Sequence, residues 1–242
     1  MSAEKIKEYA KNLRLLYILN NIDDELAKKR NLSSKTEDFL CELLRKETLL
    51  RSERSKNARI KNAGFPYKKH LDELLVDKLP EDARKRFAEL STLDFVAQGQ
   101  NIVQYGNPGT GKTHLAIGLG IHAAEAGYSV KFYSVPTLVN RLKELKMQKN
   151  ILSIQKHFEN IDLLILDELG YISFDREGGE LLFSHLSLRT ERKSTIVTTN
   201  LSFDKWKSIF IDPVLTTAIV DRISHNSFVI NMVGKSFRQQ LD

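Results

Sequence analysis

The sequence predicts an α/β fold, a parallel sheet flanked by helices, preceded by a small all-helical N-terminal domain. Two observations predict it. From about residue 100 onward, short apolar runs alternate with amphipathic runs of helical period, which is the pattern of strands joined by crossover helices. Over roughly the first sixty residues, apolar side chains recur only at helical spacing. We therefore expect a helical domain over residues 1–66 and the sheet domain over residues 67–242.

The helical domain rests on two stretches in which apolar residues recur at helical spacing, Ile6–Tyr17 and Phe39–Leu50. Ser34 is the expected N-cap of the second stretch, and Gly64-Phe-Pro66 is expected to end it. The single cysteine, Cys41, has no partner for an internal disulfide and belongs to no zinc framework, so we expect a packed helix residue.

Short apolar runs predict the strands of the sheet domain. The run Leu163–Leu166 is apolar without alternation, as expected for a strand buried on both faces. Amphipathic segments around and between the runs predict the helices. The expected strands are Asn101–Tyr105, Ser129–Ser134, Leu163–Leu166 and Thr195–Thr198, and the expected helices include Glu81–Leu90, His114–Ala126 and Pro136–Leu145.

The composition is that of an ordinary soluble globular protein, with 41% hydrophobic and 28% charged residues. No stretch approaches the roughly 18–20 apolar residues that a membrane helix needs, and the first residues carry no secretory apolar region. We therefore expect a cytoplasmic protein with no membrane partner.

The net charge of +6 is concentrated in one segment. Arg45–Lys69 holds nine basic and two acidic residues, whereas the residues before it balance and those after it number 20 basic against 21 acidic. Such a segment is typical of polyanion binding; the alternative is a solvated helix face. Candidates for neutralising nucleic-acid phosphates are Arg51, Arg54, Lys56, Arg59 and Lys61, with a second cluster of Arg141, Lys143, Lys146 and Lys149 opposed only by Glu144.

A glycine-rich motif follows the first expected strand and precedes a helix, which is the context of a phosphate-binding loop. Its glycines allow a tight turn whose N–H groups face a phosphate, and the helix N-terminus adds a favourable field. Lys112 would contact the β- and γ-phosphates, and the Thr113 hydroxyl would bind magnesium. The alternative is a glycine-rich turn without a ligand. The motif comprises Gly106, Asn107, Pro108, Gly109, Thr110, Gly111, Lys112 and Thr113.

Two adjacent carboxylates, Asp167 and Glu168, end the apolar strand that begins at Leu163. Carboxylates at the end of a doubly buried strand are costly unless cations or polar groups receive them. Asp167 would hold Mg²⁺, and Glu168 would polarise the water that attacks the γ-phosphate of ATP. The alternative is the start of a solvated loop.

These motifs resemble the AAA+ ATPases, within them the helicase-loader branch, and most closely the IstB-type helper ATPases of insertion sequences. The resemblance spans most of the chain and is densest between residues 101 and 238. It rests on Gly109–Ala116, Leu166–Tyr171, Thr198–Asn200, Trp206, Ile209–Phe210, Ala218–His225 and Gly234–Arg238, and upstream on Glu47, Arg51 and Ala63–Pro66.

The resemblance implies roles for further residues. Asn200 would orient the attacking water, Arg222 would be an arginine finger acting on the ATP of a neighbouring subunit, and Arg238 would be a second sensor. His114 belongs to the implied nucleotide site. For Asn200 the alternative is a turn former, and for Arg222 a salt bridge within its own subunit. Arg189 and Arg192 would face either a subunit interface or solvent.

The sequence departs from the family at two places. Asn107 stands where many relatives have proline, which should leave phosphate binding intact because the glycines and Lys112 remain. The sequence also ends four residues after Arg238, so we expect the helical lid of larger AAA+ proteins to be absent or very short.

The resemblance implies a transposition helper that binds ATP and Mg²⁺, forms homo-oligomers on duplex DNA with little sequence preference, deforms that DNA and engages an IstA-type transposase. Two alternatives stay open: a replicative helicase loader of the DnaC type, and a nucleotide-gated scaffold without useful hydrolysis.

Overall fold

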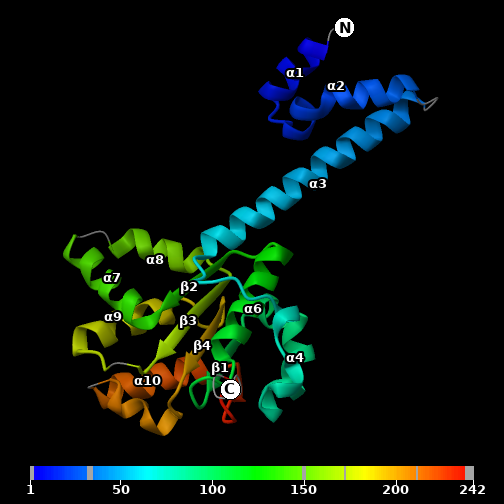
Figure 1. Ribbon diagram of the computed structural model, residues 1–242. Helices are drawn as coiled ribbons and strands as arrows, with labels where there is room; N and C mark the ends of the chain where they lie inside the picture. Colours follow the sequence, from blue (N-terminus) through cyan, green and yellow to red (C-terminus); the bar gives the residue numbers. More distant parts are fainter. Residues whose placement is uncertain (1–2, 32–34, 149–150, 172, 211, 238–242) are drawn as a thin grey trace. The chain divides into compact units, whose positions relative to one another are not determined.

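The computed structural model describes residues 3–31, 35–148, 151–171, 173–210 and 212–237, and the chain divides into two compact units, Met1–Ala58 and Arg59–Asp242 (Figure 1). The first unit contains helices α1 (Ala3–Asn12), α2 (Leu16–Asn31) and most of α3 (Thr36–Ala63). Ala10, Ile18, Ile22 and Leu43 form its small core. The proposed N-cap Ser34 lies outside the described residues.

Helix α3 is one continuous helix that contains the part of the basic segment from Arg45 to Ala63. It ends immediately before Gly64, as the sequence predicts. Gly64 follows its last residue with φ of +77°, a left-handed conformation that favours glycine. The expectation for Cys41 is wrong, because its side chain is exposed. The buried face of α3 runs through Leu43 and Glu47, and Cys41 lies on the other side of the helix.

A buried carboxylate begins helix α2. Glu47 is 5% exposed, and its two oxygens accept hydrogen bonds from the backbone N–H groups of Leu16 at 2.9 Å and Ile18 at 3.0 Å. These N–H groups belong to the first turn of α2, which has no hydrogen-bond acceptors within its own helix. Glu47 therefore satisfies them with a charge that also suits the positive end of the helix.

Replacing Glu47 with Ala should destabilise the helical unit by about 2–3 kcal/mol, because two buried N–H groups lose a charged acceptor. Urea unfolding followed by far-UV circular dichroism measures this loss. Glu42→Ala is the control, since Glu42 pairs with Arg45 on the exposed surface of the same helix and should change stability far less than Glu47→Ala does. Equal losses in the two variants would contradict the role of Glu47.

The second unit is built on a five-stranded parallel sheet in the order β2-β3-β4-β1-β5. Four strands match the expected ones, and a fifth, β5, pairs with β1 beyond them. The sequence did not reveal β5, a strand in which only Ile230 is fully buried. The strands are β1 (Asn101–Tyr105), β2 (Val130–Ser134), β3 (Leu163–Leu169), β4 (Ser194–Thr199) and β5 (Ser227–Asn231).

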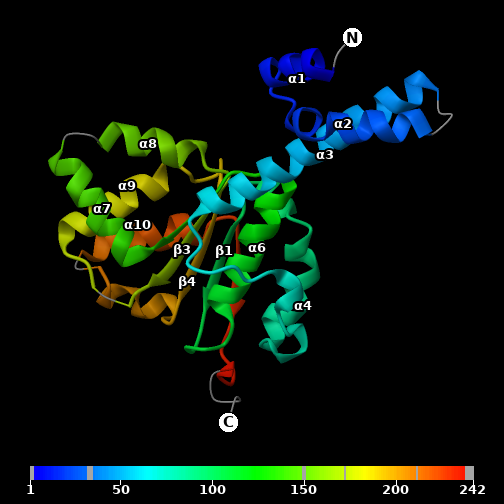
Figure 2. The ribbon, with the colours of Figure 1, turned by 45° about the horizontal axis from the view of Figure 1, so that its top comes forward.

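Helices cover both faces of this sheet, as Figures 1 and 2 show. One core contains residues of α4 and α6, and the other contains residues of α7, α8, α9 and α10. Short helices α5 (Asp94–Ala97), η1 (Leu71–Glu73), η2 (Val76–Lys78) and η3 (Phe203–Ser208) complete the unit. The longer helices are α4 (Glu81–Ser91), α6 (Lys112–Ala126), α7 (Val135–Met147), α8 (Ile151–Asn160), α9 (Arg176–Ser187) and α10 (Pro213–Ser224).

Arg189 is buried inside its own subunit, at 1% exposure, so it faces neither an interface nor solvent. Its guanidinium donates to the carbonyl of Ile161 at 2.8 Å, to that of Ser194 at 2.8 Å, and to that of Phe158. Burial lowers the pKa of Arg189 to about 10, which leaves it charged at neutral pH. It thus joins the end of α8 to the start of β4, whereas Arg192 is exposed.

Candidate functional site

The phosphate-binding loop joins β1 to α6 at the carboxyl edge of the sheet. Gly109 and Gly111 have φ of +79° and +93°, conformations that favour glycine. Gly106 is required for a second reason, because a Cβ atom there would lie 2.3 Å from the backbone carbon of Met232. The segment after β5 therefore packs directly against the loop, and Phe237 N–H donates to the Gly109 carbonyl at 2.9 Å.

The N-terminus of α6 has the features of an anion-binding site. Its N-cap is Gly111, with no side chain to accept hydrogen bonds from the N–H groups of the first turn. The Lys112 ammonium donates to the carbonyls of Gly106 at 2.7 Å and Asn107 at 2.6 Å. Burial lowers the pKa of Lys112, while the nearby Asp167 carboxylate raises it. A phosphate arriving here would meet unpaired backbone donors and a desolvated cation.

Asp167 and Thr113 form the oxygen cluster expected for magnesium. Asp167 is 6% exposed, and its Oδ1 accepts hydrogen bonds from Thr113 Oγ1 at 2.9 Å and Thr198 Oγ1 at 2.5 Å. A carboxylate and a hydroxyl beside a phosphate site are the kind of ligands that Mg²⁺ takes alongside phosphate oxygens and waters. These residues therefore fit a magnesium–nucleotide complex.

A bulge in β3 separates the two adjacent carboxylates. The register with β4 shifts between Leu166 and Leu169, and Glu168 adopts φ of +64°, a left-handed conformation that is uncommon outside glycine. The backbone N–H of Glu168 donates to Thr198 Oγ1 at 3.0 Å, which holds the bulge in place. As a result Asp167 is buried while the Glu168 side chain is exposed in the cavity next to it.

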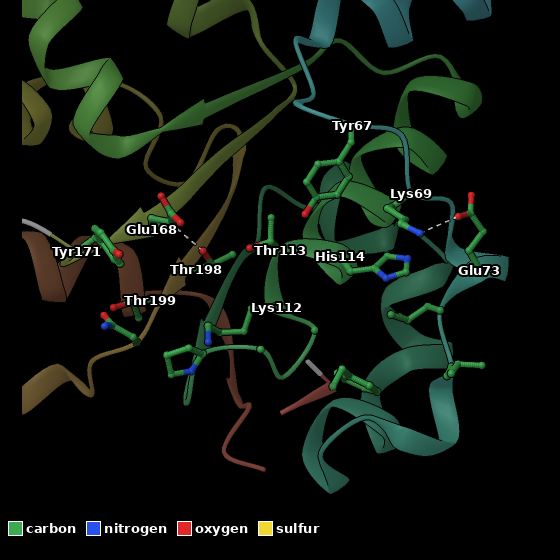
Figure 3. Close-up of a pocket in the computed structure, with 17 residues that line it drawn as sticks. Tyr67, Lys69, Glu73, Lys112, Thr113, His114, Glu168, Tyr171, Thr198 and Thr199 are labelled. Carbon is green, nitrogen blue, oxygen red and sulfur yellow. Dashed lines mark hydrogen bonds and ion pairs between the residues drawn. The ribbon is translucent and has the colours of Figure 1, made fainter. Parts of the chain in front are cut away.

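A cavity of about 570 Å³ lies over the loop (Figure 3). Lys112 and Thr113 are in its middle, with Glu168 and Tyr171 on one side and His114, Lys69 and Glu73 on the other. Its lining residues are Tyr67, Lys69, Glu73, Leu74, Leu75, Pro108, Gly109, Gly111, Lys112, Thr113, His114, Glu168, Tyr171, Thr198, Thr199, Asn200 and Phe237. The predicted residues that line it are Pro108, Gly109, Gly111, Lys112, Thr113, His114, Glu168 and Asn200, and Asp167 lies beside it, hydrogen-bonded to Thr113.

Among the described residues, the predicted arginine Arg222 does not line this cavity. Arg222 lies near the end of α10, in a small depression that it shares with Asn101 and Thr195. Asn101 is the first residue of β1 and Thr195 the second of β4, so Arg222 lies at the amino edge of the sheet. Its guanidinium stacks 4.6 Å from the ring centroid of Phe183. Arg238 lies outside the described residues.

Sequence reasoning missed the part of the cavity contributed by residues 67–75. These residues precede the sheet and form no motif; their only signal is a mixture of aromatic, charged and leucine residues that do not follow a helical period. Lys69 and Glu73 form an ion pair of 3.4 Å at the rim, and the Glu73 carboxylate also accepts from the His70 N–H. Tyr171, Thr198 and Phe237 lie in segments on which the family resemblance rests, but none of the three was predicted to line the nucleotide site.

The second basic cluster is less positive than its sequence indicates. Lys143 pairs with Asp175, the N-cap of α9, at 2.7 Å and Lys146 with Glu177 at 2.8 Å, so two acids at the start of α9 oppose them in addition to Glu144. Arg141 is exposed, and Lys149 lies outside the described residues. On α3, Arg54 and Lys61 are exposed, Arg51 donates to the Arg14 carbonyl, Arg59 donates to the Ala124 carbonyl at 2.7 Å, and Lys56 is half-buried.

Among the helices that the structure describes, none combines the length and apolar character that a membrane crossing requires.

Comparison with known proteins identifies a family that this chain matches. Residues 8–242 match the model of the family described as IstB-like ATP binding protein. The chain is 38% identical over 214 residues to an insertion sequence IS21 putative ATP-binding protein of Pseudomonas aeruginosa, covering 88% of this chain and 80% of that protein. It is 35% identical over 237 residues to the corresponding IS5376 protein of Geobacillus stearothermophilus, covering 97% and 94%.

Solved structures resemble the sheet unit. DnaI aligns with a TM-score of 0.58 at 21% identity, covering 68% of this chain and 90% of DnaI. The DnaC helicase loader aligns with a TM-score of 0.54 at 25% identity, covering 71% of this chain and 98% of that protein. AMPPCP-bound DnaA from Aquifex aeolicus aligns with a TM-score of 0.57 at 22% identity, and the match spans 50% of that longer chain.

Proposed function

The chain belongs to the family of IstB-like ATP-binding proteins and is a P-loop ATPase of the AAA+ class, and from this premise we propose that it is a transposition helper. In this proposal ATP controls the assembly of the protein on duplex target DNA. The assembled protein deforms this DNA and presents it to an IstA-type transposase. One observation carries the proposal: Lys112 and Thr113, which would bind phosphate and Mg²⁺, line the same cavity as an exposed carboxylate, Glu168, while Arg222 lies at the opposite edge of the sheet.

The proposed hydrolysis assigns one task to each residue of the cavity. Lys112 leaves the loop carbonyls to neutralise the β- and γ-phosphates, and the first-turn N–H groups of α6 hold the phosphate oxygens. Thr113 and Asp167 would hold Mg²⁺, which neutralises developing charge on the phosphates. Glu168 accepts a proton from the attacking water, and Asn200 orients that water.

Arg222 would complete the site of a neighbouring subunit, so the active form is a homo-oligomer. Its position at the amino edge places it away from its own cavity, and its described contact is the stack on Phe183. A guanidinium carries five N–H donors in a fixed plane, which can stabilise the charge of a transferring phosphoryl group.

Contacts to DNA are assigned to the basic segment of α3, chiefly its exposed arginines. Salt-dependent, phosphate-directed binding with little sequence preference follows from contacts of this kind. Lys143 and Lys146 contribute less, because each is already paired with an acid at the start of α9. Electrophoretic mobility and sedimentation with duplex DNA, ATP and Mg²⁺ test the proposal: a monomer, or binding that ignores salt and ATP, would rule it out.

The second candidate is a helicase loader, favoured by the likeness to DnaC over 98% of that protein. Co-purification with a DnaB-type helicase and, in parallel, with an IstA-type transposase separates the two candidates. Binding to the helicase alone would replace the first proposal.

Replacing Glu168 with Gln should slow ATP hydrolysis by about 10²–10⁴-fold while leaving ATP binding intact, because the amide accepts no proton from water. The variant should therefore retain the DNA-bound assembly for longer, as measured by phosphate release and by dissociation of labelled duplex after ATP dilution. Equal and negligible turnover in wild type and variant would instead support a nucleotide-gated scaffold. Glu144→Gln, on the exposed side of α7, is the control and should hydrolyse ATP as the wild type does.

A further inference from the structure

Gln104 is a polar side chain enclosed in the centre of the sheet. It is 0% exposed in β1, and neither its amide oxygen nor its amide nitrogen has a hydrogen-bond partner within the part of the chain that the structure describes. A buried amide without a partner destabilises the state that contains it. The fold holds this group immediately before the phosphate loop, two residues from Gly106.

The strand register places Gln104 beside the acidic site. Gln104 pairs with Thr198 of β4 on one side and with Ile230 of β5 on the other. Paired residues of adjacent parallel strands point to the same face, about 4.7–4.9 Å apart, which is within reach of a glutamine side chain. Ile102, two residues earlier, packs in the core beneath α6, so Gln104 faces the same helix, whose first turn brings Thr113 to Asp167.

Thr198 links the two carboxylate residues through one hydroxyl. Its Oγ1 donates to Asp167 Oδ1 at 2.5 Å and accepts the Glu168 backbone N–H at 3.0 Å. A hydroxyl carries a single proton, so it can donate to one acceptor at a time. Oδ1 of Asp167 already accepts from both Thr113 and Thr198, so a cation that binds this oxygen would compete with the Thr198 proton, and Thr198 would then need another acceptor.

We propose that Gln104 is a positioning residue for the metal-bound form of the acidic site, and that its amide oxygen accepts the Thr198 hydroxyl proton when Mg²⁺ occupies Asp167. The Thr198 oxygen then stays on the Glu168 N–H, and the bulge that presents the Glu168 carboxylate keeps its shape. This inference rests only on the nucleotide-binding part of the proposed function. Failure of DNA or transposase binding leaves it standing.

The test compares Gln104→Leu with the wild-type full chain in two measurements made without DNA. Without nucleotide, the midpoint of thermal unfolding should rise by about 2–6 °C, because an unpaired buried amide is replaced by an apolar group of similar size. The affinity for a fluorescent ATP analogue should fall about 5–10-fold with Mg²⁺ and stay within twofold of wild type with EDTA, because the partnered state needs the metal. Gln104→Met, also close in volume, replaces Gln104→Leu if the latter fails to fold.

A double-mutant cycle identifies the partner. Thr198→Val removes the hydroxyl, so in that background Gln104→Leu should weaken Mg²⁺-dependent binding by less than twofold further. Ile230→Val is the control, since it alters the other in-register neighbour of Gln104 and should lower the unfolding midpoint without changing the ratio of affinities with Mg²⁺ and with EDTA. Unchanged affinity with Mg²⁺, equal losses with Mg²⁺ and EDTA, or additive losses in the cycle would each overturn the proposal.

Discussion

Replacing Lys112 with Ala is expected to weaken ATP binding at least about 100-fold and with it to prevent assembly on DNA. The ammonium is the main point charge of the cavity, and charge-assisted hydrogen bonds to phosphate are among the strongest that a protein forms. Isothermal titration with ATP and Mg²⁺ measures the loss.

Lys69→Ala is the matched control, since Lys69 lines the same cavity but is paired with Glu73 at the rim. We expect its ATP affinity to stay within about threefold of the wild type. A comparable loss in both variants would mean that the cavity responds to total charge, and the specific role of Lys112 would be wrong.

Replacing Arg222 with Ala is expected to leave ATP binding near the wild-type value and to slow hydrolysis by about 10³-fold, because a finger arginine acts on the transition state. Mixing this variant with Lys112→Ala protein should restore part of the turnover. A subunit that cannot bind ATP still offers its own Arg222 to a neighbour that can. Phosphate release at several mixing ratios measures the recovery.

The double variant Lys112→Ala, Arg222→Ala serves as the control for this mixture, since it offers neither a functional loop nor a finger and should restore nothing. If single-variant mixtures also show no recovery, Arg222 acts within its own subunit, where the ring of Phe183 is its described partner.

The parts of the site that the sequence predicted are those whose chemistry is local. Lys112 and Glu168 each stand in a contiguous motif, and the structure brings both to one cavity, with Asp167 hydrogen-bonded to Thr113 beside it. Four of the five strands were also predicted, because each is a short run with apolar residues between amphipathic segments, and β3 is apolar without alternation from Leu163 to Leu166.

The rest depends on contacts between residues far apart in the chain. Nothing near Arg189 in the sequence shows that the carbonyls of Ile161 and Ser194 will surround it. Lys143 likewise meets Asp175 only after α7 and α9 pack together. Residues 67–75 carry no motif and enter the cavity because the chain crosses it before the sheet begins.

Because Met232 packs closely against Gly106, the phosphate-binding loop can reach its final shape only after β5 and Met232 have been synthesised. β1 is translated before the other strands, yet its two neighbours in the sheet are β4 and β5, so it must wait unpaired while the ribosome adds most of the domain. Strands β2 and β3, which pair with each other, can meet earlier. The loop that opens the nucleotide site is therefore among the first parts synthesised and among the last to reach its final shape. During that interval the nascent chain exposes a strand with two open edges.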